Sequence, residues 1–166
     1  MTMHTWFEVK VRYDKADENG LPTKVTEPYL VDALTFTEAE GRISKEMQPY
    51  ISGDFSIAAI KKANIVELFD AFGGDRWFKC RVNFIVTDME KGTEKKVANT
   101  MYVLAEDIAD ALANLQKGLQ GTMSDYTITN IAETQILDVF PYIEAVPANL
   151  KPVEKPDLAY AVSADE

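Results

Sequence analysis

The chain contains one unit twice, and this internal repeat constrains its fold more than any other feature of the sequence. Residues 6–69 align with residues 77–140 with seventeen identical pairs over 64 positions, whereas this composition would give about four by chance. The alignment needs two gaps, one between Tyr13 and Glu18 and one near Gly53, and both fall in segments of the kind that accept insertions. The chain is therefore expected to fold as two copies of one unit.

Each copy begins with a segment in which apolar and polar residues alternate. The apolar set is Phe7, Val9, Val11 and Tyr13 in the first copy, and Phe78, Cys80, Val82 and Phe84 in the second. Alternation with a period of two predicts a strand with one buried face. The turn pairs Asn19-Gly20 and Lys91-Gly92 follow, and the pattern then predicts a second strand through residues 25–33 and 97–105.

A helix signal follows the second strand in each copy. Thr35 and Glu38 have the spacing of a capping box, and Asp107 and Asp110 stand at the matching positions. The apolar stripes have helical spacing and comprise Phe36, Ala39, Ile43 and Met47, then Ile108, Ala111, Leu115 and Leu119. A third strand is predicted at residues 55–57 and 126–128. Its phase slips at the equivalent positions 60 and 131, which indicates either a bulge or the end of the strand.

The sequence thus predicts an α+β fold in which a ββαβ unit is duplicated. Each unit would form an antiparallel three-stranded sheet with one helix on its apolar face. The two units would pack about a pseudo-two-fold axis as a single domain over residues 1–140. The pattern leaves the conformation of the apolar segments 64–69 and 135–140 open. Residues 141–166 contain four prolines and are predicted to form an extended or disordered acidic tail.

The net charge of −10 limits the partners that the surface favours. Residues 141–166 contribute −3 of this charge, so residues 1–140 carry −7. Such a surface disfavours duplex DNA and anionic membranes, because binding to phosphate depends on lysine and arginine. The sequence has neither an apolar run of about 20 residues nor a signal-peptide pattern. The default expectation is a cytoplasmic protein that does not bind membranes.

The residues that most enzymes need are scarce. Cys80 is the single cysteine and His4 the single histidine, so the chain can form neither an intramolecular disulfide nor a thiolate metal cluster. Cys80 stands where the first copy has Val9, which favours a core residue over a nucleophile. Gly73-Gly74 lacks the Lys-Ser/Thr of a phosphate-binding loop, and the acidic residues form no close pair for acid–base chemistry. The sequence therefore predicts a protein that is not an enzyme and has no metal or cofactor.

The polar face of the first strand in each copy is the candidate binding face. It carries a tryptophan and two basic residues in each copy, namely Trp6, Lys10 and Arg12, then Trp77, Lys79 and Arg81. Aromatic rings between cations are typical of surfaces that bind single-stranded nucleic acid. Glu8 in the same row and the acidic surface argue against such a function. In the competing interpretation each tryptophan seals its unit against the helix of the other, and the basic residues are either solvated or paired with the surplus carboxylates.

Five short segments of the sequence are distinctive. They are Thr5-Trp6-Phe7-Glu8, Glu27-Pro28-Tyr29-Leu30-Val31-Asp32-Ala33, Thr37-Glu38-Ala39-Glu40, Asp75-Arg76-Trp77-Phe78-Lys79-Cys80 and Gly121-Thr122-Met123-Ser124-Asp125-Tyr126. With these segments the chain resembles, up to about Tyr142, a family of small proteins of unknown function from Bacteroides-type bacteria and their phages. The resemblance implies a phage or mobile-element context, and it supplies no activity, cofactor or catalytic residue.

Three functions remain open at this point. The first is a non-enzymatic binding or adaptor protein that meets a protein partner, for which we expect buried tryptophans and an exposed apolar patch elsewhere. The alternative is a protein that binds single-stranded nucleic acid through the two tryptophan-containing faces, for which we expect exposed tryptophans. The third is an acidic mimic of nucleic acid. Edge strands of two small sheets would also allow a homodimer.

Overall fold

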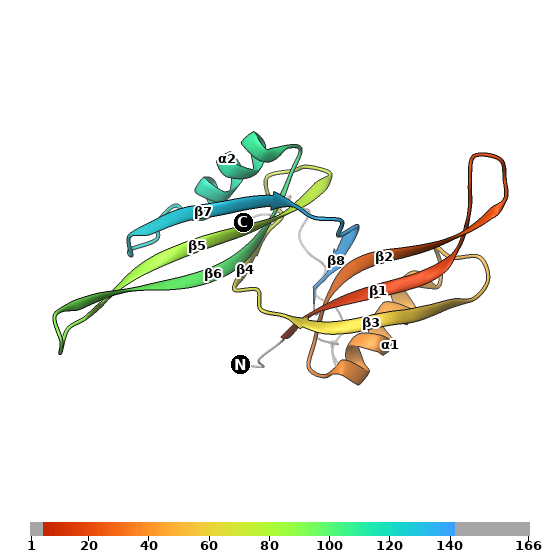
Figure 1. Cartoon of the computed structure of the whole chain (residues 1–166), viewed down its shortest axis with the longest axis horizontal. Helices are drawn as coiled ribbons and strands as arrows, with labels where there is room; N and C mark the ends of the chain where they lie inside the picture. Colours follow the sequence, from red (N-terminus) through yellow and green to blue (C-terminus); the bar gives the residue numbers. More distant parts are fainter. Residues whose placement is uncertain (1–4, 142–166) are drawn as a thin grey trace, which may run out of the picture.

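Two four-stranded sheets, each covered on one face by a helix, make up residues 5–141, the part of the chain that the computed structural model describes (Figure 1). The first copy contributes β1 (Thr5–Ala16), β2 (Pro22–Ala33), α1 (Phe36–Met47) and β3 (Phe55–Ala63). The second contributes β5 (Arg76–Asp88), β6 (Thr93–Ala105), α2 (Ile108–Gly118) and β7 (Tyr126–Glu133) in the same order. The predicted α+β fold with a repeated ββαβ unit is confirmed. The predicted tail lies almost wholly outside the described residues.

Local details recur at matching positions of the two copies. The β1–β3 pairing shifts register between Lys10 and Val11, and the β5–β7 pairing shifts between Arg81 and Val82. At the helix starts, the Thr35 hydroxyl accepts a hydrogen bond from the Glu38 amide at 3.1 Å, and the Asp107 carboxylate accepts one from the Asp110 amide at 2.8 Å. The predicted bulge and both predicted caps are therefore present.

The segments that the sequence left open are short strands exchanged between the copies. The last strand of the first copy, β4 (Glu67–Phe69), pairs in parallel with β6 of the second copy. The last strand of the second copy, β8 (Asp138–Phe140), pairs in parallel with β2 of the first. Each sheet thereby gains a fourth strand beyond the three that the sequence predicts. Figure 1 shows the two sheets side by side, with β4 and β8 crossing between them and the long hairpins pointing to opposite ends.

Three apolar clusters hold this arrangement together. Two of them lie between a helix and its sheet; Ile43 of α1 and Leu115 of α2 are fully buried in them. The third joins the copies and contains Leu30, Trp77, Tyr102 and Ile136, with Trp6 packed at its side. Because this third cluster takes side chains from both sheets, the copies share a core.

Polar side chains of the helices attach each helix to the second strand of its own copy. Arg42 of α1 donates hydrogen bonds to the carbonyl oxygens of Asp32 and Pro141, the latter at 2.8 Å. Asn114, at the matching position of α2, is buried and donates to the carbonyl of Leu104 at 3.0 Å. Arg42 thus also fixes the chain that leaves the exchanged strand β8.

Candidate functional site

The two tryptophans of the predicted binding face lie between the copies. Trp77 is only 6% exposed, and Trp6 is half-buried against the same cluster. They pack among side chains of the two sheets, whereas the competing interpretation expected contact with a helix. A buried ring has no free face on which a base could stack. The structure therefore buries Trp77 between the sheets and leaves Trp6 partly exposed beside the same cluster.

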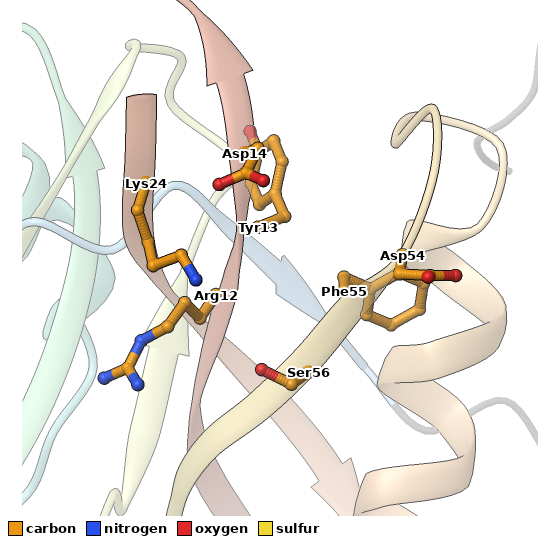
Figure 2. Close-up of a pocket in the computed structure, with 7 residues that line it drawn as sticks. All are labelled: Arg12, Tyr13, Asp14, Lys24, Asp54, Phe55 and Ser56. Atoms are coloured by element: carbon orange, nitrogen blue, oxygen red, sulfur yellow. The ribbon is translucent and has the colours of Figure 1, made fainter. Parts of the chain in front are cut away.

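The basic residues of that face, Lys10, Arg12, Lys79 and Arg81, are all exposed. Arg12 lines a shallow pocket of about 240 Å³ at the β1–β3 side of the first sheet. In Figure 2 the Arg12 and Lys24 side chains lie close together on one side of this pocket, with Asp54 and Phe55 on the other. Asp14 also lines it. Two basic and two acidic side chains give the pocket no net charge, which does not favour phosphate.

Lys79 lies in a different place, at the junction of the two copies. It lines a pocket of about 270 Å³ together with Lys61, Lys62 and Glu8. The Lys61 ammonium and the Glu8 carboxylate are 3.9 Å apart. Glu8 and Lys79 occupy matching positions of the repeat, so the structure brings equivalent positions of the two copies into one pocket. Lys79 is not among the residues that line the Arg12 pocket.

A third pocket, which the sequence analysis did not predict, lies on the helix side of the first sheet, and we call it the tyrosine pocket. Its volume is about 360 Å³, within the range typical of small-ligand sites. It is lined by residues of β1, β2, the end of α1 with the turn that follows it, and the segment around β8: Tyr13, Lys15, Glu27, Tyr29, Met47, Tyr50, Ile51, Leu137, Asp138 and Phe140. The exchanged strand therefore supplies one wall, so both copies build this pocket.

Glu27 is the polar centre of the tyrosine pocket. Its side chain is only 15% exposed, and one carboxylate oxygen, Oε1, accepts hydrogen bonds from the hydroxyls of Tyr13 at 2.7 Å and Tyr29 at 3.3 Å. The other oxygen, Oε2, lies 3.7 Å from the ammonium of Lys15. Tyr13 and Glu27 meet because they are diagonal neighbours on one face of the β1–β2 pair.

The two tyrosines remain neutral donors at physiological pH. Burial, the hydrogen bond to Glu27 and its negative charge raise the pKa of Tyr13 to about 12. The pKa of Tyr29 is raised further, first by burial and then by the charge of Glu27. A negative charge on either ring would be repelled by the carboxylate, so both hydroxyls keep their protons and hold the carboxylate in place.

Aromatic rings form the walls of the tyrosine pocket. The rings of Tyr29 and Phe140 are stacked, with centroids 5.9 Å apart and an interplanar angle of 28°. At the rim, Tyr50 is 78% exposed and Leu137 is 54% exposed. A large apolar surface of this kind beside a hydrogen-bonded carboxylate is typical of binding sites.

The sequence analysis missed this pocket because it treated the buried face of the second strand as purely apolar. Glu27 stands on that face, between Val25 and Tyr29, and a carboxylate there is an available signal. Comparison of the two copies gives a second signal. The positions of Tyr13, Glu27 and Tyr29 hold Phe84, Asn99 and Met101 in the second copy, so the carboxylate with its two tyrosine donors is confined to the first.

Within residues 5–141, no three His, Cys, Asp or Glu side chains are grouped so that they could hold a metal ion. None of the helices described there has the length and apolar character needed to cross a membrane. Burial raises the pKa of the Cys80 thiol to about 11, and at that value the thiol stays protonated at neutral pH.

Comparison with protein families gives a match over almost all of the described chain. Residues 5–142 match the model of a domain of unknown function, DUF4494. The chain belongs to this family. No curated protein and no solved structure matches it. The description of the family names no activity, ligand or partner.

Proposed function

We propose that this member of the family is a non-enzymatic binding protein that meets a protein partner through the tyrosine pocket. The observation that carries the proposal is the exposed aromatic and apolar rim around a half-buried carboxylate, with Tyr50 and Leu137 both more than half exposed. Tyrosine is enriched at protein interfaces because its ring buries a large area while its hydroxyl makes hydrogen bonds. The phage or mobile-element setting and the cytoplasmic location stay part of the proposal, on the sequence grounds given above.

A binding function fits the chemistry of the pocket better than a catalytic one. Tyr13 and Tyr29 have raised pKa values and donate to the same carboxylate, so they are poor proton donors to a substrate at neutral pH. The burial of Trp77 likewise supports the protein partner over single-stranded nucleic acid, because it removes one of the two stacking platforms.

Site-specific photo-crosslinking tests this proposal. The crosslinking amino acid p-benzoylphenylalanine replaces Tyr50 at the pocket rim, and in a control chain it replaces Thr122, the matching position of the second copy. We expect one protein to be crosslinked from position 50, to be absent from position 122, and to be displaced by excess unmodified chain.

Equal labelling from both positions, or no competable product from position 50, would contradict the proposal. Salt-sensitive quenching of tryptophan fluorescence by a poly-dT oligonucleotide would support the nucleic-acid alternative in its place.

A further inference from the structure

The tyrosine pocket combines aromatic walls with an excess of negative charge. Glu27 lies between Tyr13 and Tyr29, and Asp138 pairs with Tyr29 across the β2–β8 ladder. Lys15 is the one basic side chain among the pocket residues, and its side chain is 60% exposed. Two carboxylates and one exposed ammonium leave a formal charge of −1 at the pocket, and the whole chain carries −10. The expected guest is therefore a cation.

We infer that the tyrosine pocket binds the guanidinium group of an arginine from a basic segment of the partner, an inference that rests on the proposed function. A guanidinium is planar, so it stacks on aromatic rings, and it donates a fork of hydrogen bonds that fits a carboxylate. The rings open to a guest are those of Phe140, which is only partly buried, and Tyr50, which is 78% exposed. Tyr29 is buried behind Phe140, and its hydroxyl and that of Tyr13 fix Oε1 of Glu27. The second oxygen, Oε2, is then oriented toward the guest.

Lys15 is a stand-in for this guest. Its ammonium lies 3.7 Å from Oε2 of Glu27, which shows that a cation is accommodated there. An exposed lysine pair of this kind is weak, because solvent screens the charges and the long side chain loses freedom in holding one position. A guanidinium that also stacks on the rings can therefore displace Lys15. Removing Lys15 should therefore increase the affinity for the guest, whereas the loss of a charged pocket residue usually decreases affinity.

The second copy provides the matched control. Its helix side has Asn99 in place of Glu27 and Met101 in place of Tyr29, so it has neither the carboxylate nor the aromatic ring. The substitution Glu27→Asn installs a side chain that the same scaffold already accepts at the matching position. It removes the charge and one methylene group.

The test is a titration of the ¹⁵N-labelled full chain with the blocked peptide acetyl-Gly-Arg-Gly-amide, followed by ¹H–¹⁵N NMR. A second peptide carries citrulline, the neutral isostere of arginine. We expect saturable shifts at the amides of Tyr13, Glu27 and Tyr29 and none at Phe84, Asn99 or Met101. Citrulline or Glu27→Asn should weaken binding about tenfold or more, since each leaves one charged partner without the other. Lys15→Ala should tighten it about two- to fivefold, in the range of an exposed ion pair.

Equal affinity for the two peptides, shifts confined to other surfaces, or weaker binding by Lys15→Ala would each overturn the inference. The citrulline comparison and Lys15→Ala decide the matter even if Glu27→Asn fails to fold. The two proposals fail separately. A specific crosslink from position 50 without NMR shifts from the arginine peptide would support the protein-binding function and refute arginine as the bound group. Absence of both the crosslink and the shifts would refute the binding function itself.

Discussion

The two copies share one scaffold and differ in how each packs the strand received from the other. In the first copy, Phe140 of β8 stacks on Tyr29, and an open pocket remains beside the two rings. In the second copy, Phe69 of β4 lies directly against α2, and a Cβ placed on Gly118 would be only 2.7 Å from its ring. Glu46 stands at the matching position of α1. The same exchanged phenylalanine thus borders a pocket in one copy and is packed onto the helix in the other.

This difference teaches where to look for function in a duplicated chain. Positions that are identical in both copies include turn and core residues that build the scaffold, such as Gly20 and Ala39. Polar residues on the buried face of β2 are costly unless they are hydrogen-bonded. The first copy has a carboxylate there, Glu27, together with two tyrosines that satisfy it, whereas the second has Phe84, Asn99 and Met101 at these positions. The departure from the repeat therefore marks the specialised site.

The largest predicted loss of stability comes from the two helix–sheet cores, which are built alike in the two copies. Ile43 and Leu115 occupy matching, fully buried positions of α1 and α2. Replacing either by alanine should lower the free energy of unfolding by about 2–5 kcal/mol, through lost burial and the cavity left behind. Because the exchanged strands and the third cluster join the copies, each variant should shift the whole urea transition, followed by circular dichroism.

Two separate transitions, with one unaffected by Ile43→Ala and the other by Leu115→Ala, would mean that the copies unfold independently. A conservative variant on the solvent side of a helix, Lys45→Arg, serves as the control and should change stability by less than about 0.5 kcal/mol.

A smaller effect is expected where the copies differ. Gly118→Ala should lower the free energy of unfolding by about 1–3 kcal/mol, because the new methyl group must displace the Phe69 ring. The control is Glu46→Ala at the matching, exposed position of α1, which should change stability by less than about 0.5 kcal/mol. Chemical denaturation of both variants measures the contrast.

Helix propensity works in the opposite direction, since alanine is favoured over glycine by about 1 kcal/mol inside a helix. A stabilising effect of Gly118→Ala would therefore show that the Phe69 ring moves aside at little cost. The packing of Phe69 on α2 would then differ less from the open setting of Phe140 than the structure indicates.

Most of the scaffold could be predicted from the sequence because each element has a local signal that occurs twice. Alternation specifies β1 and β5, and the caps at Thr35 and Asp107 specify where the helices begin. The exchange of β4 and β8 could not be predicted, because three-residue strands have too little periodicity to identify and their partners lie in the other copy. A single sequence carries no signal for that pairing.

The candidate site was harder to predict for a related reason. Trp6 and Trp77 stand on the polar side of an alternating pattern, which indicates exposure when a copy is considered alone. Packing of the two sheets against each other buries Trp77 and partly covers Trp6, and this contact depends on the arrangement of both copies. Glu27 was visible in the sequence, but its importance emerges only when Tyr13 and Tyr29 are seen to donate to it.

The smallest predicted effect concerns alkaline pH, at which the tyrosines of the first copy should reduce stability. Burial and the hydrogen bond to Glu27 raise the pKa of Tyr13 from 10.0 to about 12, and the pKa of Tyr29 is also raised. Between about pH 10 and pH 12 the unfolded chain loses these protons while the folded chain keeps them, so the free energy of unfolding must fall as pH rises. Below about pH 10 the two states hold the same protons, and this stabilisation is fully present.

Urea denaturation from about pH 9 to about pH 11 measures this slope. The double variant Tyr13→Phe, Tyr29→Phe should show a shallower fall than the natural chain. Cys80 and Tyr102, whose pKa values are also raised by burial, contribute equally to both. Phe84→Tyr places a tyrosine at the matching position of the second copy, near Asn99, and should steepen the fall less than Tyr13 does, because no carboxylate opposes its ionisation there. Equal slopes of the free energy of unfolding against pH in all three chains would contradict this prediction. They would mean that Glu27 does not raise the pKa values of Tyr13 and Tyr29 above that of a tyrosine in the second copy.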